Sequence, residues 1–150
     1  MAVSQSGRAL GVDLGSVRIG LALSDPTRTV ASPLDVLTRE RDRDADHRAI
    51  VAVARDNGVT TIVVGLPRSL SGRLGPAARA AEAEIAELRA VVDPEVDVVA
   101  HDERLTTVTA ERALDEARVD RRTRTAVVDK VAAAVMLQSW LESRAATQVR

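Results

Sequence analysis

Acidic residues interrupt three segments that the sequence otherwise predicts to be buried. Asp13 lies in the apolar run 8–14, Asp129 stands alone in the apolar segment 126–137, and the adjacent Asp102 and Glu103 end an apolar run. A buried carboxylate without a partner is costly in free energy. If the three positions converge, their mutual repulsion requires a cation, and oxygen ligands of this kind favour Mg²⁺ or Mn²⁺.

Each acid, taken alone, also has a simpler interpretation as a capping or salt-bridged carboxylate. Asp129 could pair with Arg122, Arg124 or Lys130. Asp102 and Glu103 are neighbours, so on an extended strand they face opposite sides and only one of them joins a cluster easily. The prediction of a metal site therefore depends on the three acidic positions together.

Arginines gather just before the segment that contains Asp129. Residues 118–124 include Arg118, Arg121, Arg122 and Arg124 and a single acid. The guanidinium group binds phosphate in a bidentate manner, so this basic linker is a candidate nucleic-acid surface, and a solvated linker is an equal alternative. Three further arginines next to predicted turns could extend that surface: Arg18, Arg68 and Arg73.

The composition excludes several classes of function. The chain has 150 residues, no cysteine and two histidines, which excludes disulfides, iron–sulfur clusters and cysteine-based zinc sites. Trp140 is the one aromatic residue, so a surface that stacks several bases is excluded. The net charge of −1 means that any binding of nucleic acid must use a local patch. Without a signal peptide or a membrane-spanning run, we expect a soluble, cytoplasmic protein that does not bind membranes.

The hydrophobic pattern predicts an α/β domain. Strands are predicted at 8–14, 18–24, 33–38, 60–65 and 95–101, and helices at 46–57, 77–92, 107–117 and 126–144. The charged stretch 39–46 is interpreted as a solvated loop and the start of a helix, Trp140 as a core or dimer residue, and His101 as packed at the end of a strand. This order predicts a mixed sheet with helices on its faces. We expect one domain over 8–144, with flexible ends at 1–7 and 145–150.

Four sequence blocks resemble the YqgF/RuvX family of Holliday-junction resolvases and pre-16S rRNA nucleases. The blocks are GVDLGSVRIGLALSD (11–25), IVVGLPRSLSG (62–72), HDERLTT (101–107) and DKVAAAVMLQSWL (129–141). They occur in the order of the family and span nearly the whole chain. The third and fourth blocks together are the specific ones, because a hairpin like the first also opens actin-like ATPases. Ser71-Gly72 departs from the acidic or amide residue that the family often has in this loop.

The resemblance implies an RNase H-like fold, a mixed five-stranded sheet flanked by helices. It also implies that Asp13, Glu103 and Asp129 are the catalytic, metal-binding acids. The expected activity is hydrolysis of phosphodiester bonds in structured nucleic acid by two Mg²⁺ or Mn²⁺ ions. The expected substrate is the 5′ end of pre-16S rRNA, and a four-way DNA junction is the alternative. The expected state is a monomer or a homodimer.

Two functions of other classes compete with this interpretation. A catalytically silent module could use the same fold to bind nucleic acid during ribosome assembly, and metal-dependent cleavage would exclude it. An actin-like nucleotide phosphotransferase is suggested by GVDLGS alone. The length argues against it, because such enzymes need two related domains with a nucleotide cleft between them.

Overall fold

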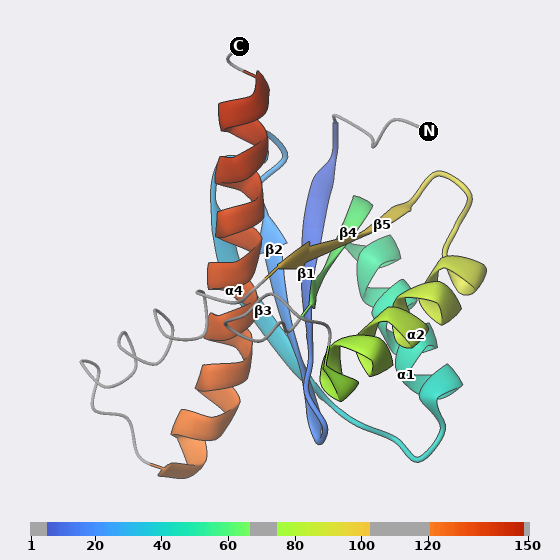
Figure 1. Ribbon diagram of the computed structural model, residues 1–150. Coiled ribbons are helices and arrows are strands. Elements are labelled where there is room, and N and C mark those ends of the chain that lie inside the picture. The colour runs from blue at the N-terminus through green and yellow to red at the C-terminus, as the bar shows by residue number, and fades with distance from the viewer. Residues whose placement is uncertain (1–5, 67–74, 103–120, 149–150) are drawn as a thin grey trace.

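Five strands form one mixed sheet in the order β3-β2-β1-β4-β5 (Figure 1). The structure, a computed structural model, describes residues 6–66, 75–102 and 121–148, with side chains of the last range described for 128–145. The strands are β1 (Arg8–Leu14), β2 (Arg18–Ser24), β3 (Ala31–Thr38), β4 (Val59–Leu66) and β5 (Asp97–Asp102). All five lie within two residues of the predicted positions, because short apolar runs bounded by turn residues define them.

The first three strands form an antiparallel meander, and β4 and β5 run parallel to β1. In the register, Val12 pairs with Val64 of β4, and the next residue of β4, Gly65, pairs with His101 of β5. The carboxyl ends of β1, β4 and β5 therefore meet at one edge of the sheet. Asp13 is one residue beyond Val12 and lies at that edge.

Helices cover both faces of the sheet (Figure 1). α1 (Arg43–Asp56) and α2 (Pro76–Val91) pack on one face, and α4 (Arg121–Gln148) crosses the other. The side chain of Asp42 caps α1 by accepting a hydrogen bond from the backbone N–H of Asp44. Pro76 occupies the first turn of α2, where its missing N–H costs nothing. The helix predicted at 107–117 lies outside the described residues.

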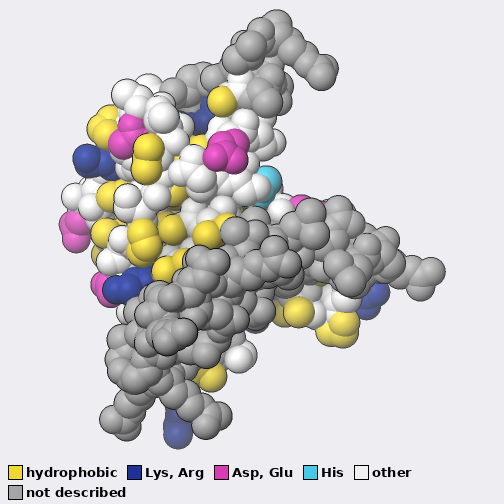
Figure 2. All heavy atoms as spheres, turned by 90° about the vertical axis from the view of Figure 1, so that its left-hand side faces the viewer, with side chains coloured by type: hydrophobic (Ala, Val, Ile, Leu, Met, Phe, Trp, Pro, Cys, Tyr) yellow, Lys and Arg dark blue, Asp and Glu magenta, His cyan; other side chains and the backbone are white. Residues whose placement is uncertain are grey.

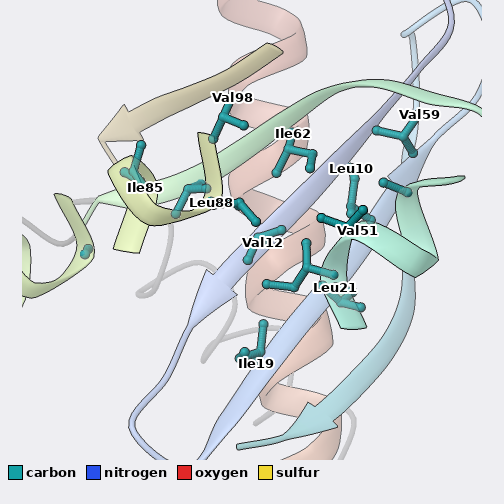
Figure 3. Packing of buried hydrophobic residues seen from close by; sticks show 14 of the residues in the cluster. Leu10, Val12, Ile19, Leu21, Val51, Val59, Ile62, Ile85, Leu88 and Val98 are labelled. Carbon is teal, nitrogen blue, oxygen red and sulfur yellow. The ribbon is translucent and has the colours of Figure 1, made fainter. Parts of the chain in front are cut away.

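Branched aliphatic side chains fill the space between the sheet and α1 and α2 (Figure 3). Alternate residues of a strand face opposite sides, so Leu10, Val12, Ile19, Leu21 and Ile62 all point to this layer and are fully buried. They meet Val51 of α1 and Ile85 and Leu88 of α2. This layer is the larger of the two apolar clusters.

Small residues line the opposite face, under α4. Ala9, Ala22 and Val63 of the sheet meet Ala133, Leu137 and Trp140 of the helix. Trp140 is buried here, as the sequence predicted for a core residue. A Cβ atom at Gly11 would lie 2.9 Å from the Cβ of Leu137, so the helix rests almost directly on the backbone of β1.

The structure corrects two predictions about charged segments. In the stretch 39–46, expected to be solvated, the side chain of Asp46 is buried and that of Arg39 is nearly so, because Asp46 pairs with Arg39 and Arg39 pairs with Glu84 of α2. The basic linker expected over 118–124 is helical from Arg121 onward, and α4 continues to Gln148. Within the described ranges, no helix has the length and apolarity needed to span a membrane.

Candidate active site

Asp13 and Asp129 come together on the face of the sheet that α4 covers. Asp13 pairs with Gly20 across the β1–β2 ladder, so Gly20 is the direct neighbour of the acid. A Cβ atom at Gly20 would lie only 2.0 Å from the carbonyl oxygen of Asp129. Because Gly20 has no side chain, the backbone of α4 can approach β2 closely at Asp129.

The two carboxylates repel each other in a partly buried place. Burial, and to a smaller extent the negative charge of Asp129, raises the pKa of Asp13 from its ordinary value of 3.8 to about 6. Burial and a like charge both disfavour the ionised carboxylate. Perturbed carboxylates of this kind are typical of functional sites.

Arg18 of β2 is the partner of Asp129. Its Nε donates a hydrogen bond of 2.6 Å to Oδ2 of Asp129, and both side chains are partly exposed, at 33% and 24%. This partner was not among the three candidates taken from nearby sequence, because it lies on a strand 111 residues earlier. Of those candidates, Arg122 and Arg124 have side chains outside the described part of the helix. The alternation of side chains along a strand could have indicated the contact between Arg18 and α4, because Arg18 and Gly20 lie on the same face of β2.

Of the two acids at the end of β5, the structure describes Asp102. Val98 packs in the α1 and α2 layer, whereas Val99 packs against the α4 layer. By this alternation Asp102 belongs with Val98, on the side of the sheet away from Asp13. Glu103 lies outside the described residues.

His101 fixes β5 to α4. Its Nε2 lies 3.0 Å from the hydroxyl oxygen of Ser139, in hydrogen-bond contact. Burial lowers the pKa of His101, and the negative charge of Asp102 opposes that shift. This agrees with the expectation that His101 packs at the end of a strand. The contact lies ten residues along α4 from Asp129, about 15 Å along the helix axis.

The described part of the predicted nucleic-acid surface is small. Arg18 is engaged with Asp129. Arg68, Arg73 and Arg118 lie outside the described residues, and Arg121, Arg122 and Arg124 occupy the first turn of α4, about two turns before Asp129. In the view onto the side of the molecule that carries α4 (Figure 2), the basic side chains that are described stand singly rather than in one patch.

Asp13 and Asp129 have the chemistry of ligands for a hard divalent cation. Both offer carboxylate oxygens, which Mg²⁺ and Mn²⁺ prefer. A bound cation would also remove the repulsion that raises the pKa of Asp13. The described residues alone do not assemble three His, Asp or Glu side chains that could hold a metal. The third predicted acid, Glu103, falls outside that part of the chain.

Comparison with known proteins shows which family the chain resembles. Residues 7–143 match the family RuvX, described as Holliday junction resolvase. A "Putative pre-16S rRNA nuclease" of Mycobacterium sp. (strain KMS) is 44% identical over 140 residues, which covers 93% of this chain and 82% of the relative. A protein of the same name from Roseiflexus sp. (strain RS-1) is 43% identical over 141 residues and covers 94% and 98%.

A solved structure shares the fold. RuvC of T. thermophilus in complex with a Holliday junction substrate superposes with a TM-score of 0.53 and 18% identity, covering 93% of this chain and 96% of that one. The predicted RNase H-like sheet is thereby confirmed. The expectation of a nuclease is borne out as well, because the family description and the names of both relatives denote enzymes that cut nucleic acid. The chain belongs to the RuvX family.

Proposed function

We propose that this protein hydrolyses phosphodiester bonds in structured nucleic acid with Mg²⁺ or Mn²⁺ held at the Asp13–Asp129 site. The observation that carries the proposal is the paired acids themselves. Burial, together with repulsion from Asp129, raises the pKa of Asp13 to about 6, and the two acids lie where β1 meets α4 at one edge of the sheet. Such a pair is unfavourable in a purely structural role, since it weakens the fold without a cation.

We infer that Glu103 completes the site with Asp13 and Asp129. Asp102 belongs with the residues of β5 that face away from Asp13, so its neighbour is the better choice for the third ligand. A bound Mg²⁺ or Mn²⁺ ion supplies an activated water and stabilises the departing oxygen. The role of the three acids is to hold that charge in a fixed place beside the nucleic-acid backbone.

Arg18 has a part in the same site as an orienting residue. Its hydrogen bond to Oδ2 of Asp129 leaves the other carboxylate oxygen available to a cation. Its partial exposure also places a positive charge near the scissile phosphate. The remaining basic residues of the proposed nucleic-acid surface are Arg68, Arg73, Arg118, Arg121, Arg122 and Arg124.

The proposed substrate is the 5′ end of pre-16S rRNA, since the names of the relatives give pre-16S rRNA as what they cut. One active site in one small domain cuts one strand, and trimming an RNA end requires only one cut. With a single aromatic residue in the chain, recognition of shape is favoured over recognition of sequence. This function would place the protein in the cytoplasm, as a monomer or a homodimer.

The second candidate is resolution of four-way DNA junctions, which the description of the family favours. Symmetric resolution needs two cuts, and therefore two copies of the chain that hold their sites at a fixed distance. The oligomeric state on the junction separates the two candidates. A monomer that makes paired, symmetric incisions would contradict this reasoning.

The decisive experiment offers both substrates to the purified protein. A 16S precursor and a four-way junction are incubated with Mg²⁺, with Mn²⁺ and with excess EDTA, and the cuts are mapped. The site variants are Asp13→Asn, Asp129→Asn and Glu103→Gln. Asp35→Asn is the matched control, because Asp35 is exposed on the edge strand β3 and accepts a hydrogen bond from the backbone of Val36.

We expect the three site variants to stay folded and to lose cleavage, whereas Asp35→Asn keeps it. Full activity in EDTA would contradict the metal-dependent mechanism. Loss of activity in Asp102→Asn but not in Glu103→Gln would reverse the choice of third ligand. Binding of either substrate without any cut by the wild-type protein would favour the non-catalytic module.

A further inference from the structure

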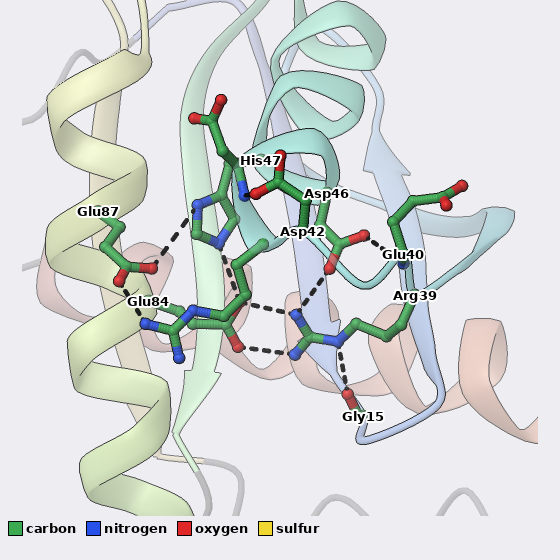
Figure 4. Close-up of polar contacts among 10 residues, drawn as sticks. Gly15, Arg39, Glu40, Asp42, Asp46, His47, Glu84 and Glu87 are labelled. Atoms are coloured by element: carbon green, nitrogen blue, oxygen red, sulfur yellow. Dashed lines mark hydrogen bonds and ion pairs between the residues drawn. The ribbon is translucent and has the colours of Figure 1, made fainter.

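A group of charged side chains is buried on the face of the sheet opposite α4 (Figure 4). It consists of Arg39, Asp46, His47 and Glu84 and is called the Arg39 cluster below. Arg39 precedes α1, Asp46 and His47 lie in the first turns of α1, and Glu84 lies in the middle of α2. The cluster therefore ties together the segment after β3 and two helices.

Arg39 and Glu84 form the centre of the Arg39 cluster. The two terminal nitrogens of Arg39 donate to the two carboxylate oxygens of Glu84, each at 2.7 Å. Asp46 Oδ2 lies 3.3 Å from Nη1 of Arg39, and His47 Nε2 lies 2.9 Å from Oε1 of Glu84. A bidentate pair of this kind fixes the plane of the guanidinium as well as its position.

The Arg39 cluster is electrostatically satisfied. Burial alone would raise the pKa of Glu84, but hydrogen bonds from Arg39 and His47 outweigh it and hold that pKa below its usual value. The hydrogen bond to Glu84 is the main cause of a raised pKa at Arg39. Among the described residues, no buried side-chain polar atom lacks a hydrogen-bond partner. A buried network in which every polar group is hydrogen-bonded holds its side chains rigidly in one arrangement.

Arg39 also holds the turn between β1 and β2 with its remaining donors. Its Nε donates to the carbonyl oxygen of Gly15 at 2.9 Å, and its backbone N–H donates to the carbonyl oxygen of Val17, also at 2.9 Å. One residue thus contacts both sides of the turn from beneath. The turn joins Asp13 to Arg18, the two sheet residues that face Asp129.

The turn itself has little freedom to adjust. The N–H of Gly15 lies 3.1 Å from the carbonyl oxygen of Asp13 and 2.9 Å from that of Arg18. A Cβ atom at Gly15 would lie 2.5 Å from the carbonyl oxygen of Arg18. A displacement of Gly15 is therefore passed to both Asp13 and Arg18 through the backbone.

We propose that Arg39 is a positioning residue for the metal site, which acts by holding the Gly15 turn in the geometry that directs Asp13 and Arg18 toward Asp129. The inference rests on the proposed function, because it gives the turn a catalytic purpose. Arg39 reaches the site only through the backbone, from the opposite face of the sheet. A purely structural ion pair would instead stabilise the fold as a whole. Its loss would then loosen the Gly15 turn no more than any other part of the fold.

Arg39→Lys is the variant that isolates this role. A lysine retains the charge for Glu84, but one ammonium group cannot keep the bidentate pair and the bond to Gly15 together. Arg55→Lys is the matched control, because Arg55 forms an equivalent bidentate pair with Asp93, at 2.9 and 2.7 Å, on the exposed surface. Val51→Ala, in the apolar layer under α1, provides a variant of lowered global stability with the Arg39 cluster intact.

Two measurements are compared at equal global stability, which is adjusted with urea. Hydrogen exchange follows the backbone amides of Gly15 and of position 39, and the Mg²⁺ dependence of cleavage gives the half-saturating concentration. In Arg39→Lys we expect both amides to exchange about tenfold faster and the half-saturating Mg²⁺ concentration to rise about 10-fold or more, with cleavage recovering at high Mg²⁺. Arg55→Lys and Val51→Ala should leave both quantities near their wild-type values.

The outcomes separate this proposal from the proposed function. Exchange at Gly15 that is equal in Arg39→Lys and Val51→Ala overturns the positioning role, whatever the nuclease activity is. A wild-type protein that cuts no substrate overturns the proposed function, and the exchange data still decide whether Arg39 holds the turn. If Arg39→Lys does not fold, Arg39→Met combined with Glu84→Leu removes the central pair of charges and is compared in the same way. Asp46 then keeps its hydrogen bond from the backbone N–H of Glu40.

Discussion

The face of the sheet under α1 and α2 is packed with branched aliphatic side chains, whereas the face under α4 presents mostly small residues, alanines and glycines, to the larger side chains of that helix. The first face also buries charge, but in the fully bonded Arg39 cluster. The second face holds the repelling pair of Asp13 and Asp129. One sheet therefore supports two layers of opposite character.

We infer that one layer provides most of the stability of the fold and that the other holds the candidate site. Burial of aliphatic surface stabilises the folded state by roughly 25 cal/mol per Å² and does not depend on the orientation of the groups. The α1 and α2 layer therefore provides most of the stability of the fold. The α4 layer has close backbone contact at Gly11 and Gly20, which depends on the absence of side chains. We expect the α4 layer to tolerate little change in geometry, and the predictions below test that contrast.

The largest effect is expected at Gly20. In Gly20→Ala, the new methyl group would lie 2.0 Å from the carbonyl oxygen of Asp129, so α4 must shift away from β2. We expect a stability loss of about 3 kcal/mol, at the upper end for overpacking, and a loss of cleavage of about 100-fold, because the site is misplaced. Urea denaturation and initial cleavage rates measure the two effects.

Gly75→Ala is the control for that substitution. A Cβ atom at Gly75 meets nothing within 4 Å, and the residue lies before the first turn of α2. Its stability and activity should remain close to those of the wild type. A Gly20→Ala protein that behaves like Gly75→Ala would refute the close approach of α4.

A smaller effect is expected from one substitution made on each face. Val63 and Val64 are adjacent and fully buried in β4, but Val63 faces α4 and Val64 faces α1 and α2. Each Val→Ala change should cost about 2 kcal/mol, from two lost methyl groups and the cavity they leave. Only Val63→Ala should also slow cleavage, by about threefold or more. An equal loss of rate in both variants would remove the distinction between the faces.

A third effect, on stability without metal, concerns the charge of Asp13. Its folded-state pKa, about 6, lies above the ordinary 3.8, so ionisation of this group costs stability as pH rises between those values. Without metal, Asp13→Asn should be more stable than the wild type by about 1–3 kcal/mol at pH 8, an amount reduced by partial exposure. The difference should shrink as the pH falls from about 6 and disappear below about pH 3, where Asp13 is protonated in both states.

Urea denaturation of both proteins across this pH range measures the difference. Added Mg²⁺ should stabilise the wild type, by about 2.7 kcal/mol at a hundredfold excess over its dissociation constant. It should stabilise Asp13→Asn less. A variant that is no more stable than the wild type at pH 8 would argue against the repulsion.

Most of the fold could be predicted from local patterns. The β-branched run of β4, the proline that opens α2 and the glycine after α1 each define an element without help from distant residues. Gly58, after α1, has a φ of +65°, the conformation expected of a glycine at a helix end. The bounds of α4 were less predictable, because its amino-terminal turns are rich in arginine rather than apolar residues.

The site could be predicted only in part. Asp13 and Asp129 were identifiable because each interrupts an apolar segment. Arg18 was missed as the partner of Asp129, and the burial of Arg39 was missed altogether. Both depend on residues far along the chain, Asp129 for Arg18 and Glu84 for Arg39. A local pattern of alternating charge, such as residues 39–46, does not reveal whether its partners will bury it.

The distance along the chain between Arg18 and Asp129 has a consequence for the life of the protein in the cell. The five strands precede α4 in chain order, and the hydrogen bonds that join α4 to β2 and β3 connect residues more than 100 positions apart. Domains form during synthesis from the amino terminus onward. A nascent chain can therefore build its sheet and aliphatic layer while it still lacks the helix that brings Asp129 to Asp13. Such a chain would lack the Asp13–Asp129 pair, so the proposed metal site would form only after α4 has been synthesised.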